Sequence, residues 1–297
     1  MHTTSVLINN YNNGKFLAAC IDSVLRQTVP ADEVIVYDDG STDESVEILR
    51  GYGDRIILLG AHDAARPSRE NQANAVYRAF ERASGDWIFL LDGDDLFMPE
   101  KIERVLWTLQ RRDGISLVQS PLALIDAQGR TFGQYRDQRF HNLEIRSAIY
   151  EQNDVDFFYP TSAMVVSREA LSLVLPLDMR VAPELACDTR IGMLMPLLGQ
   201  VVTIDENLAG WRRHSGSYIT AMGQTRWFPV QQTFRRVRTF NTTAIEFGAR
   251  SLSLWKNRRL RRQIAGALLP KTIRQKLREG GAVLHAAHRA RPKCLGA

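Results

Sequence analysis

Three aspartates lie within four positions, directly after an apolar run, in the segment LLDGDD at 90–95. Carboxylates this close repel one another unless a positive charge lies among them. Oxygen ligands in this number suit a hard divalent cation such as Mg²⁺ or Mn²⁺. The segment also has the composition of a polar turn that caps the next helix. The spacing therefore predicts either a metal site or a capped turn at Asp92, Asp94 and Asp95.

A second acidic segment, YDDGSTDES at 37–45, also follows an apolar run. Gly40 permits a tight turn, and the Ser-Thr-Asp after it can cap a helix. Asp38 and Asp39 exceed what such a turn needs. Their carboxylates can accept hydrogen bonds from a nucleobase N–H or from ribose hydroxyls. The segment predicts a capped turn together with a nucleoside contact.

The elements that must position these acids alternate along the first part of the chain. Strands are expected at 5–9, 34–37, 55–59 and 86–91, and helices at 14–27, from a cap at 41 or 42 to 49, at 70–83 and at 99–112. This alternation predicts an α/β fold, in which a doubly wound, mostly parallel sheet carries helices on both faces. Ligands bind at the carboxyl ends of the strands in such sheets, so both acidic segments should face one crevice.

Beyond about residue 115 the pattern changes. Strands are expected at 116–120, 163–166 and 201–204, a helix at 188–198, a polar stretch at 126–156 and a helix-rich region at 226–297. We therefore expect a less regular second half that is followed by a helical extension.

Taken together, these features resemble family 2 glycosyltransferases of the GT-A fold. That family shows strands ending in Tyr-Asn, in Asp-Asp-Gly-Ser-x-Asp and in Leu-Asp-x-Asp-Asp. The matching segments here are Tyr11-Asn12, 38–43 and 91–95, with the turn Ser84-Gly85-Asp86 before the last strand. The resemblance covers about residues 4–217. It implies a GT-A domain at 1–217, with a nucleotide-sugar half at about 1–112 and an acceptor half at about 113–217, and a basic extension at 218–297.

The resemblance also implies roles for the donor-side residues. Tyr11 would lie beside the nucleobase, and Asp39, together with Asp38, would bind the base or the ribose. Asp92 would lie near the ribose. Asp95 would either support the site or approach the donor sugar.

The same resemblance implies a bound Mg²⁺ or Mn²⁺ ion. Asp94 would ligate it, and the ion would stabilise the charge on the departing nucleoside diphosphate. His214 would contact the metal or the diphosphate, although a histidine in a polar loop can equally be solvated. Arg212 and Arg213 either contact phosphate or keep that loop soluble.

The acceptor half matches the family in Cys187-Asp188, a helix ending at Gly199, the strand at 201–204 and the segment WRRH at 211–214. Asp188 has the position of the family's catalytic base, where a carboxylate can take the proton from an acceptor hydroxyl. The alternative is that Asp188 only caps its helix.

Three departures from the family pattern are visible. Asn10 stands where proline is frequent, and Cys187 replaces a commoner acid. The helix before LLDGDD has Tyr77-Arg78-Ala79 in place of Asn-x-Gly, so no donor contact is assigned to it.

Charge is unevenly distributed along the 297 residues. Residues 251–297 contain 12 Lys and Arg against one acid, Glu279, for a net charge of +11. Residues 1–250 contain 26 basic and 32 acidic residues, for a net charge of −6. Apolar residues, Trp255 among them, recur at helical intervals within the basic tail. The tail is therefore expected either to bind an anionic membrane surface peripherally or to pack on its own domain.

The composition, with 44% hydrophobic and 24% charged residues, is typical of a soluble globular protein. Three scattered cysteines, and the lack of an apparent signal peptide or membrane span, predict a cytoplasmic chain. Membrane binding by the basic tail would place the chain peripherally on the inner face of the cell membrane. No nucleic-acid-binding module is apparent.

The resemblance implies an inverting, metal-dependent glycosyltransferase that uses a nucleoside-diphosphate sugar and a hydroxyl acceptor. A lipid-linked saccharide is one candidate acceptor, and cell-surface polysaccharide or glycoconjugate synthesis is the expected process. The alternatives are a nucleotidyltransferase of related fold, which would favour a glycine-rich basic loop after the first strand, and a non-catalytic sugar-binding relative.

Overall fold

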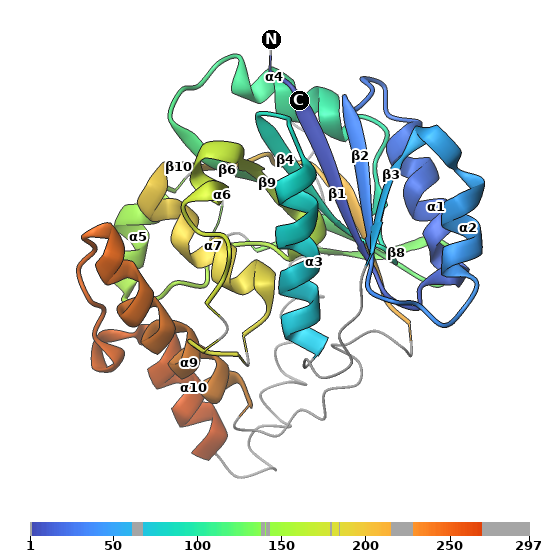
Figure 1. The fold of residues 1–297 in the computed structure, drawn as a ribbon. Coiled ribbons are helices and arrows are strands. Elements are labelled where there is room, and N and C mark those ends of the chain that lie inside the picture. Colours follow the sequence, from blue (N-terminus) through green and yellow to red (C-terminus); the bar gives the residue numbers. More distant parts are fainter. Residues whose placement is uncertain are drawn as a thin grey trace, which may run out of the picture.

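The chain forms a large sheet, a smaller second sheet and helices packed around them (Figure 1). The computed structural model describes residues 2–60, 68–137, 140, 143–178, 180–183, 185–214 and 228–268. Its strands are β1 (Thr4–Asn10), β2 (Glu33–Asp38), β3 (Ile57–Gly60), β4 (Trp87–Asp92), β5 (Leu96–Phe97), β6 (Ile115–Gln119), β7 (Leu122–Ile125), β8 (Thr131–Tyr135), β9 (Val165–Ser167), β10 (Gln200–Thr203) and β11 (Ala209–Arg212).

The α-helices are α1 (Gly14–Leu25), α2 (Ser45–Gly51), α3 (Ser68–Arg82), α4 (Lys101–Leu109), α5 (Ile145–Gln152), α6 (Arg168–Ser172), α7 (Cys187–Leu198), α9 (Phe228–Thr243) and α10 (Arg258–Leu268). Short 3-10 helices are η1 (Gly53–Arg55), η3 (Thr161–Ala163), η4 (Ala244–Phe247) and η5 (Leu254–Lys256).

The large sheet has the strand order β10-β6-β9-β4-β1-β2-β3. The pairs β1–β2, β1–β4, β2–β3 and β6–β10 are parallel, and only β9 runs antiparallel to its neighbours β4 and β6. Helices cover the sheet, with α3 packed on β1 and β2 and α7 on β6 and β10. The predicted doubly wound, mostly parallel α/β fold is confirmed.

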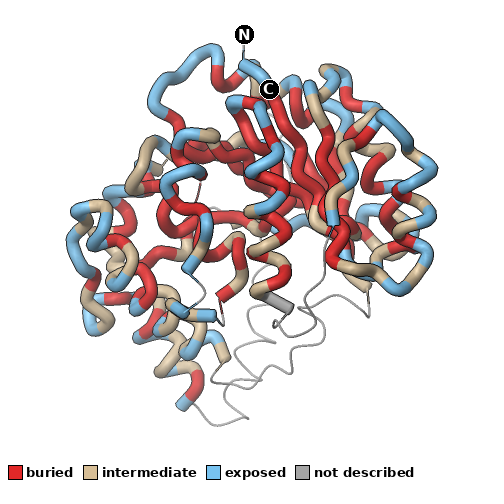
Figure 2. Tube along the Cα trace, in the orientation of Figure 1, coloured by how far each residue is buried: buried red, intermediate tan, exposed pale blue. Residues whose placement is uncertain are grey.

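The central strands are buried on both faces, which explains their continuous apolar runs (Figure 2). On α1 the residues Leu17, Cys20, Ile21 and Val24 are all buried, as their helical spacing predicts. The core therefore forms between the sheet and the apolar stripes of its helices.

The register of the parallel strands brings both acidic segments to one edge of the sheet. Asn10 at the end of β1 pairs with Asp38 at the end of β2. Asn9 pairs with Asp92 at the end of β4. Both acidic segments therefore lie at one edge of the sheet, as expected.

The second sheet, in the order β5-β11-β7-β8, was not expected from the sequence. The segment 126–156, which looks polar in the sequence, contains β8. Its residues are exposed or half-buried because β8 lies at the edge of the sheet. Asp126 turns the β7–β8 hairpin, since its Oδ1 accepts the N–H groups of Gln128 and Arg130, both over 2.9 Å. Gly129 follows with a φ of 82°, which favours glycine. This local turn was readable, whereas the pairing of β7 with β11 was not.

The predicted helical C-terminal extension is present in the described residues as α9 and α10, which pack on each other (Figure 1). Val237 and Phe240 of α9 are buried, and so are Leu260 and Ala267 of α10. Trp255, just before α10, is 86% exposed. Residues 269–297 of the basic tail lie outside the described residues. Within the described part of the chain, every helix is too short or too polar to cross a bilayer.

Candidate active site

The loop after β4 makes a tight turn against the end of β1. The Gly93 N–H donates to the Asn9 carbonyl oxygen over 2.9 Å. A Cβ atom on residue 93 would lie 2.8 Å from Asn10 Oδ1 and 3.0 Å from the Asn9 carbonyl oxygen. Only glycine leaves room for this approach, so the turn fixes where the flanking aspartates lie.

Asp95 is an internal anchor of this loop. One carboxylate oxygen accepts the Ser162 hydroxyl over 2.6 Å, and the other accepts the Arg212 N–H over 2.8 Å. Burial raises the pKa of Asp95 well above its usual range, and the charges of Asp94 and Asp92 raise it further. Of the two roles expected for Asp95, these contacts favour support of the site over contact with the donor sugar.

A buried cation, Lys101 of α4, lies beneath the same loop. Its Nζ donates to the Ser162 carbonyl oxygen over 2.9 Å and lies 4.5 Å from the centre of the Phe97 ring. Burial lowers the pKa of Lys101 to about 7, and the nearby charge of Asp95 opposes that shift. Lys101 thus offers a positive charge close to the acidic loop.

Asp92 ends β4 and begins the acidic loop 92–95. Its Oδ1 accepts the Asn9 side-chain amide over 2.8 Å. Burial raises the pKa of Asp92 to about 7, with further contributions from the charges of Asp94 and then Asp188. The Asp92 backbone N–H donates to the Ser162 hydroxyl over 3.2 Å, and the N–H of the neighbouring Thr161 donates to Asp188 Oδ2 over 3.3 Å.

Asp94 and His214, the two expected metal contacts, lie together. Asp94 Oδ2 is 3.0 Å from His214 Nε2. Within the described residues, no three His, Cys, Asp or Glu side chains surround a common point suited to a metal ion. Mg²⁺ and similar ions often bind through one or two protein groups, and substrate phosphates and water supply the remaining ligands. The Asp94–His214 pair fits this kind of site.

Arg212 has a role that neither of its predicted alternatives included. The residue is buried, and its Nε donates to the Asp94 carbonyl oxygen over 2.6 Å. Its Nη1 donates to the carbonyl oxygens of Asp126 and Ala127, over 2.9 and 3.2 Å. Its guanidinium lies 4.8 Å from the centre of the Phe16 ring. Arg212 therefore joins the acidic loop 92–95 to the β7–β8 hairpin.

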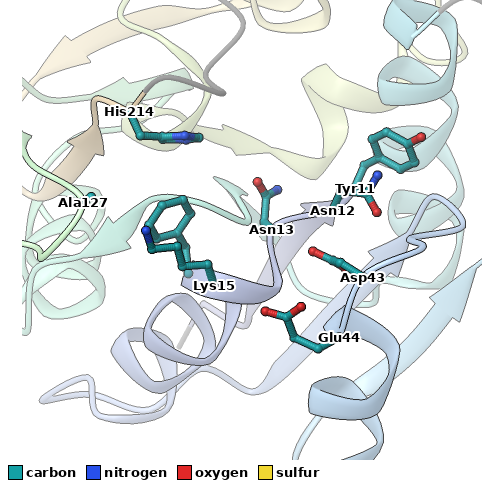
Figure 3. A pocket seen from close by; sticks show the side chains of 9 residues that line it. Tyr11, Asn12, Asn13, Lys15, Asp43, Glu44, Ala127 and His214 are labelled. Atoms are coloured by element: carbon teal, nitrogen blue, oxygen red, sulfur yellow. The ribbon is translucent and has the colours of Figure 1, made fainter.

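A cavity of about 740 Å³ opens beside His214, the histidine that contacts Asp94 (Figure 3). The cavity lies between α1, the loop after β2 and the end of β11. It is lined by Tyr11, Asn12, Asn13, Lys15, Phe16, Asp43, Glu44, Ala127 and His214. Tyr11, 49% exposed, and His214 come from opposite ends of the lining (Figure 3). The volume of the cavity falls in the range of small-molecule sites. The cavity extends from Tyr11, the expected nucleobase contact, to His214, the expected metal contact.

The two aspartates after β2 have different surroundings. Asp38 Oδ1 accepts the Asn10 side-chain amide over 2.7 Å and the Ser41 hydroxyl over 2.6 Å. Its Oδ2 accepts the Ser41 N–H over 2.9 Å. Asp38 is thus occupied in shaping the turn, and Asp39 beside it is also buried.

Asp188 lies in the first turn of α7 but does not cap that helix, since the capping position belongs to Ala186. Its Oδ2 accepts the Thr161 N–H over 3.3 Å, and its Oδ1 accepts the N–H of Thr189 over 2.5 Å. Thr161 begins η3, the short helix whose next residue, Ser162, anchors Asp95. Asp188 is therefore held next to the acidic loop.

Sequence reasoning missed the polar residues that hold the acids in place. Asn9 and Asn10 end a buried strand, where unpaired amides are costly, and this was a readable signal. Ser162, Lys101 and the backbone contacts of Arg212 had no readable signal, because their partners are distant in the sequence.

Comparison with known proteins shows the family of the chain. The model of the family described as Glycosyl transferase family 2 matches residues 5–174. An uncharacterized glycosyltransferase of Nostoc sp. is 32% identical over 217 residues, which cover 72% of this chain and 65% of the Nostoc protein. Glycosyltransferase GlyG of Streptococcus pneumoniae is 26% identical over 234 residues, which cover 75% of each protein.

Two solved structures share the fold at low sequence identity. S. aureus TarS 1-349 in complex with UDP-GlcNAc superposes with a TM-score of 0.58 and 16% identity, covering 88% of this chain and 71% of that one. The mannosyltransferase PcManGT from Pyrobaculum calidifontis, in complex with GDP-Man and Mn²⁺, gives a TM-score of 0.55 and 17% identity, covering 95% of this chain and 80% of that one.

Proposed function

The chain belongs to glycosyl transferase family 2, and on that premise we propose that it moves a sugar from a nucleoside-diphosphate donor to an acceptor hydroxyl by a single, inverting displacement. The observation that carries this proposal is the convergence of Asp94, Asp92 and Asp188. Ser162 of η3 contacts Asp92 and Asp95, and the neighbouring Thr161 donates its N–H to Asp188, so the 92–95 loop and the base lie around the same short helix.

The chain's own residues divide the work of binding the donor. Tyr11 lies at the nucleobase end of the cavity, and Asp39 and Asp92 hold the nucleoside. Asp94 and His214, which lie together, would hold an Mg²⁺ or Mn²⁺ ion. When bound, that ion stabilises the negative charge that develops on the departing nucleoside diphosphate.

Asp188 acts as the general base. Its carboxylate takes the proton from the acceptor hydroxyl while the hydroxyl oxygen attacks the anomeric carbon. The bond from that carbon to the diphosphate oxygen breaks in the same displacement, and nucleoside diphosphate is the leaving group. A single base without a protein nucleophile gives inversion at the anomeric carbon.

The test is release of nucleoside diphosphate from UDP-glucose, UDP-GlcNAc and GDP-mannose, with Mn²⁺, with Mg²⁺ and with a chelator. Release from at least one donor, lost in chelator, is expected. Absence of release from these donors, together with condensation of a sugar phosphate and a nucleoside triphosphate, would instead support the nucleotidyltransferase alternative.

We further propose that the extension lies on an anionic membrane surface at the cytoplasmic face, where a lipid-linked saccharide acceptor for cell-surface polysaccharide or glycoconjugate synthesis would be found. The supporting observation is the outer surface of residues 255–268. Trp255 and Leu268 are exposed there, beside the exposed cations Arg258, Arg261 and Arg262. A basic helix with exposed apolar residues suits peripheral binding to anionic lipid.

A further inference from the structure

Lysine is rare in the first 250 residues of the chain. Residues 1–250 contain 26 Lys and Arg, and of these only Lys15 and Lys101 are lysines. Lys101 is buried beneath the acidic loop 92–95, where its Nζ donates to the Ser162 carbonyl oxygen over 2.9 Å. Lys15 is exposed on α1 and lines the cavity. Both lysines therefore lie at the proposed donor site, and the role of Lys15 is still unassigned.

Lys15 lies at the end of the cavity that contains the proposed metal contact. Its Nζ is 5.6 Å from the centre of the Phe16 ring. The same ring packs against the His214 imidazole, with ring centroids 4.7 Å apart, and His214 Nε2 lies 3.0 Å from Asp94 Oδ2. Figure 3 shows Lys15 and His214 on one side of the cavity and Tyr11 on the other. A donor that extends from Tyr11 to His214 would therefore bring its diphosphate to the Lys15 ammonium.

The arginines near this end of the cavity are committed to the protein's own groups. Arg212 donates to three backbone carbonyl oxygens, one in the acidic loop and two in the β7–β8 hairpin. The guanidinium of Arg213 lies 4.8 Å from the centre of the Trp211 ring, and Arg213 is not part of the cavity lining. The Lys15 ammonium makes no ion pair or hydrogen bond among the described residues. Lys15 is therefore the cation that remains available to a ligand.

Helix stability does not explain a lysine at this position. Lys15 belongs to the first turn of α1, and that turn contains no acidic residue. A cation there is unfavourable, because the N-terminus of a helix carries a partial positive charge. Asp43 already supplies the favourable anion, since its Oδ2 accepts the Gly14 N–H over 2.8 Å. An anionic ligand in the cavity would offset the cost of placing Lys15 here.

The charges at the proposed donor site require more positive charge than a divalent ion supplies. Each phosphate group of a nucleotide sugar is negative, and Asp94 adds a further negative charge. Asp43 and Glu44, which also line the cavity, increase this excess. Among the described residues, Lys15 is the only lysine or arginine of the lining, so it is the side chain that can reduce the excess.

We propose that Lys15 binds the diphosphate of the donor, through a hydrogen bond from its ammonium to a phosphate oxygen. This inference rests on the proposed function and adds a donor-binding residue outside the acidic motifs. Lysine binds phosphate as a compact point charge on a flexible stem. The negative charge on the diphosphate grows as the sugar departs, so the same contact strengthens during transfer.

The experiment compares the binding of a nucleoside diphosphate with that of the nucleoside alone, both in the presence of Mn²⁺. The nucleotide is whichever of UDP, GDP and dTDP gives the largest thermal shift. Calorimetry gives the Kd of the diphosphate, and displacement of the diphosphate gives the Kd of the nucleoside. Lys15→Ala should raise the Kd of the diphosphate by about tenfold or more, as expected for loss of a hydrogen bond from a charged donor. The Kd of the nucleoside should not change, because the nucleoside has no phosphate.

Further variants separate the charge of Lys15 from its bulk. Lys15→Met keeps the length without the charge and should bind as Lys15→Ala does, whereas Lys15→Arg should recover most of the affinity. Lys256→Ala is the matched control, because Lys256 is an exposed lysine of η5 that does not line the cavity. Added NaCl should weaken binding of the diphosphate more in the wild type than in Lys15→Ala, since salt screens the ionic contact. Thermal unfolding without ligand shows whether each variant is folded.

Wild-type affinity for the diphosphate in folded Lys15→Ala and Lys15→Met would overturn the role of Lys15 and keep the proposed function. An equal loss of affinity for the nucleoside and the diphosphate would also overturn it, because the contact would then not be to phosphate. If the wild type bound no nucleoside diphosphate and released none from any nucleotide sugar, the proposed function itself would fail, and this inference with it.

Discussion

At the scale of single residues, the aspartates of the 92–95 loop differ in what their carboxylates contact. Asp95 accepts hydrogen bonds from Ser162 and Arg212 on its two oxygens, which leaves it little capacity for a ligand. Asp94 contacts His214 at the edge of the cavity. The same short motif therefore supplies a structural anchor, Asp95, and the proposed metal ligand, Asp94.

Asp94→Asn should abolish the metal-dependent part of nucleotide binding, because the amide is a poorer ligand for a hard cation than the carboxylate. The measurement is the thermal shift produced by UDP, GDP and dTDP with and without Mn²⁺, since a ligand that binds only the native state raises its apparent stability. Asp113→Asn, at an exposed acid away from the cavity, is the control. A wild-type response to Mn²⁺ in the Asp94 variant would remove Asp94 from the metal site.

Asp188→Asn should reduce turnover by about 10²-fold or more, in line with the usual contribution of a general base. Donor affinity should stay near the wild-type value, because the carboxylate contacts Thr161 and Thr189 on the acceptor side. The measurement is kcat for sugar transfer beside a thermal shift with donor nucleotide. If the variant loses its fold while the residual folded protein keeps full turnover, Asp188 is structural.

At the scale of elements, the loop between β4 and β5 depends on one close backbone approach. Gly93→Ala would place a Cβ atom 2.8 Å from Asn10 Oδ1 and 3.0 Å from the Asn9 carbonyl oxygen. The loop must shift to relieve the overlap, and overpacking of this kind costs about 1–3 kcal/mol. We expect a lower free energy of unfolding together with weaker Mn²⁺-dependent nucleotide binding.

Gly51→Ala is the matched control for this loop, because a Cβ atom on Gly51 of α2 would have nothing within 4 Å. Urea unfolding of both variants gives the comparison. Equal stability of the two alanine variants, with unchanged nucleotide binding, would show that the turn at Gly93 tolerates a side chain.

At the scale of the whole molecule, the basic extension has a buried inner side and an exposed outer side. Its inner side is used by the protein itself, through Leu260, Asn257 and Arg259. Its outer side exposes Trp255 among several arginines. The sequence offered packing and membrane binding as alternatives, and an extension with two sides can do both.

The membrane proposal predicts co-sedimentation of the full chain with anionic vesicles at low salt. Each cation near such a surface contributes about 1 kcal/mol, and salt screens that attraction, so binding should fall at high salt and with neutral vesicles. Replacing Trp255 by alanine and Arg258, Arg261 and Arg262 by glutamine should abolish it. A chain ending near Arg250 is a poorer test, because it also lacks the ion pairs of Arg259.

The control for this prediction carries the same change in charge on another surface, with Arg26, Arg111 and Arg112 replaced by glutamine. It should sediment with anionic vesicles as the wild type does. Equal solubility of wild type and extension variant beside anionic vesicles at low salt would contradict membrane binding by the described residues.

The sequence alone determined the elements that carry the donor half. Alternating apolar runs and a helical stripe on α1 identify a doubly wound sheet, because burial on both faces forces a strand to be continuously apolar. The acids at the strand ends follow from that sheet, since parallel strands place their carboxyl ends at one edge. Asp92 and Asp94 were therefore recognisable as a candidate site before any coordinates, and the family resemblance added Asp188.

Only the tertiary structure decided which acids are free to act and what holds them. Asp95 and Asp38 look like their neighbours in the sequence, yet their carboxylates are occupied by Ser162, Arg212, Asn10 and Ser41. These contacts join residues far apart in the chain, and a local pattern of hydrophobicity contains no information about which distant polar groups satisfy one another on folding.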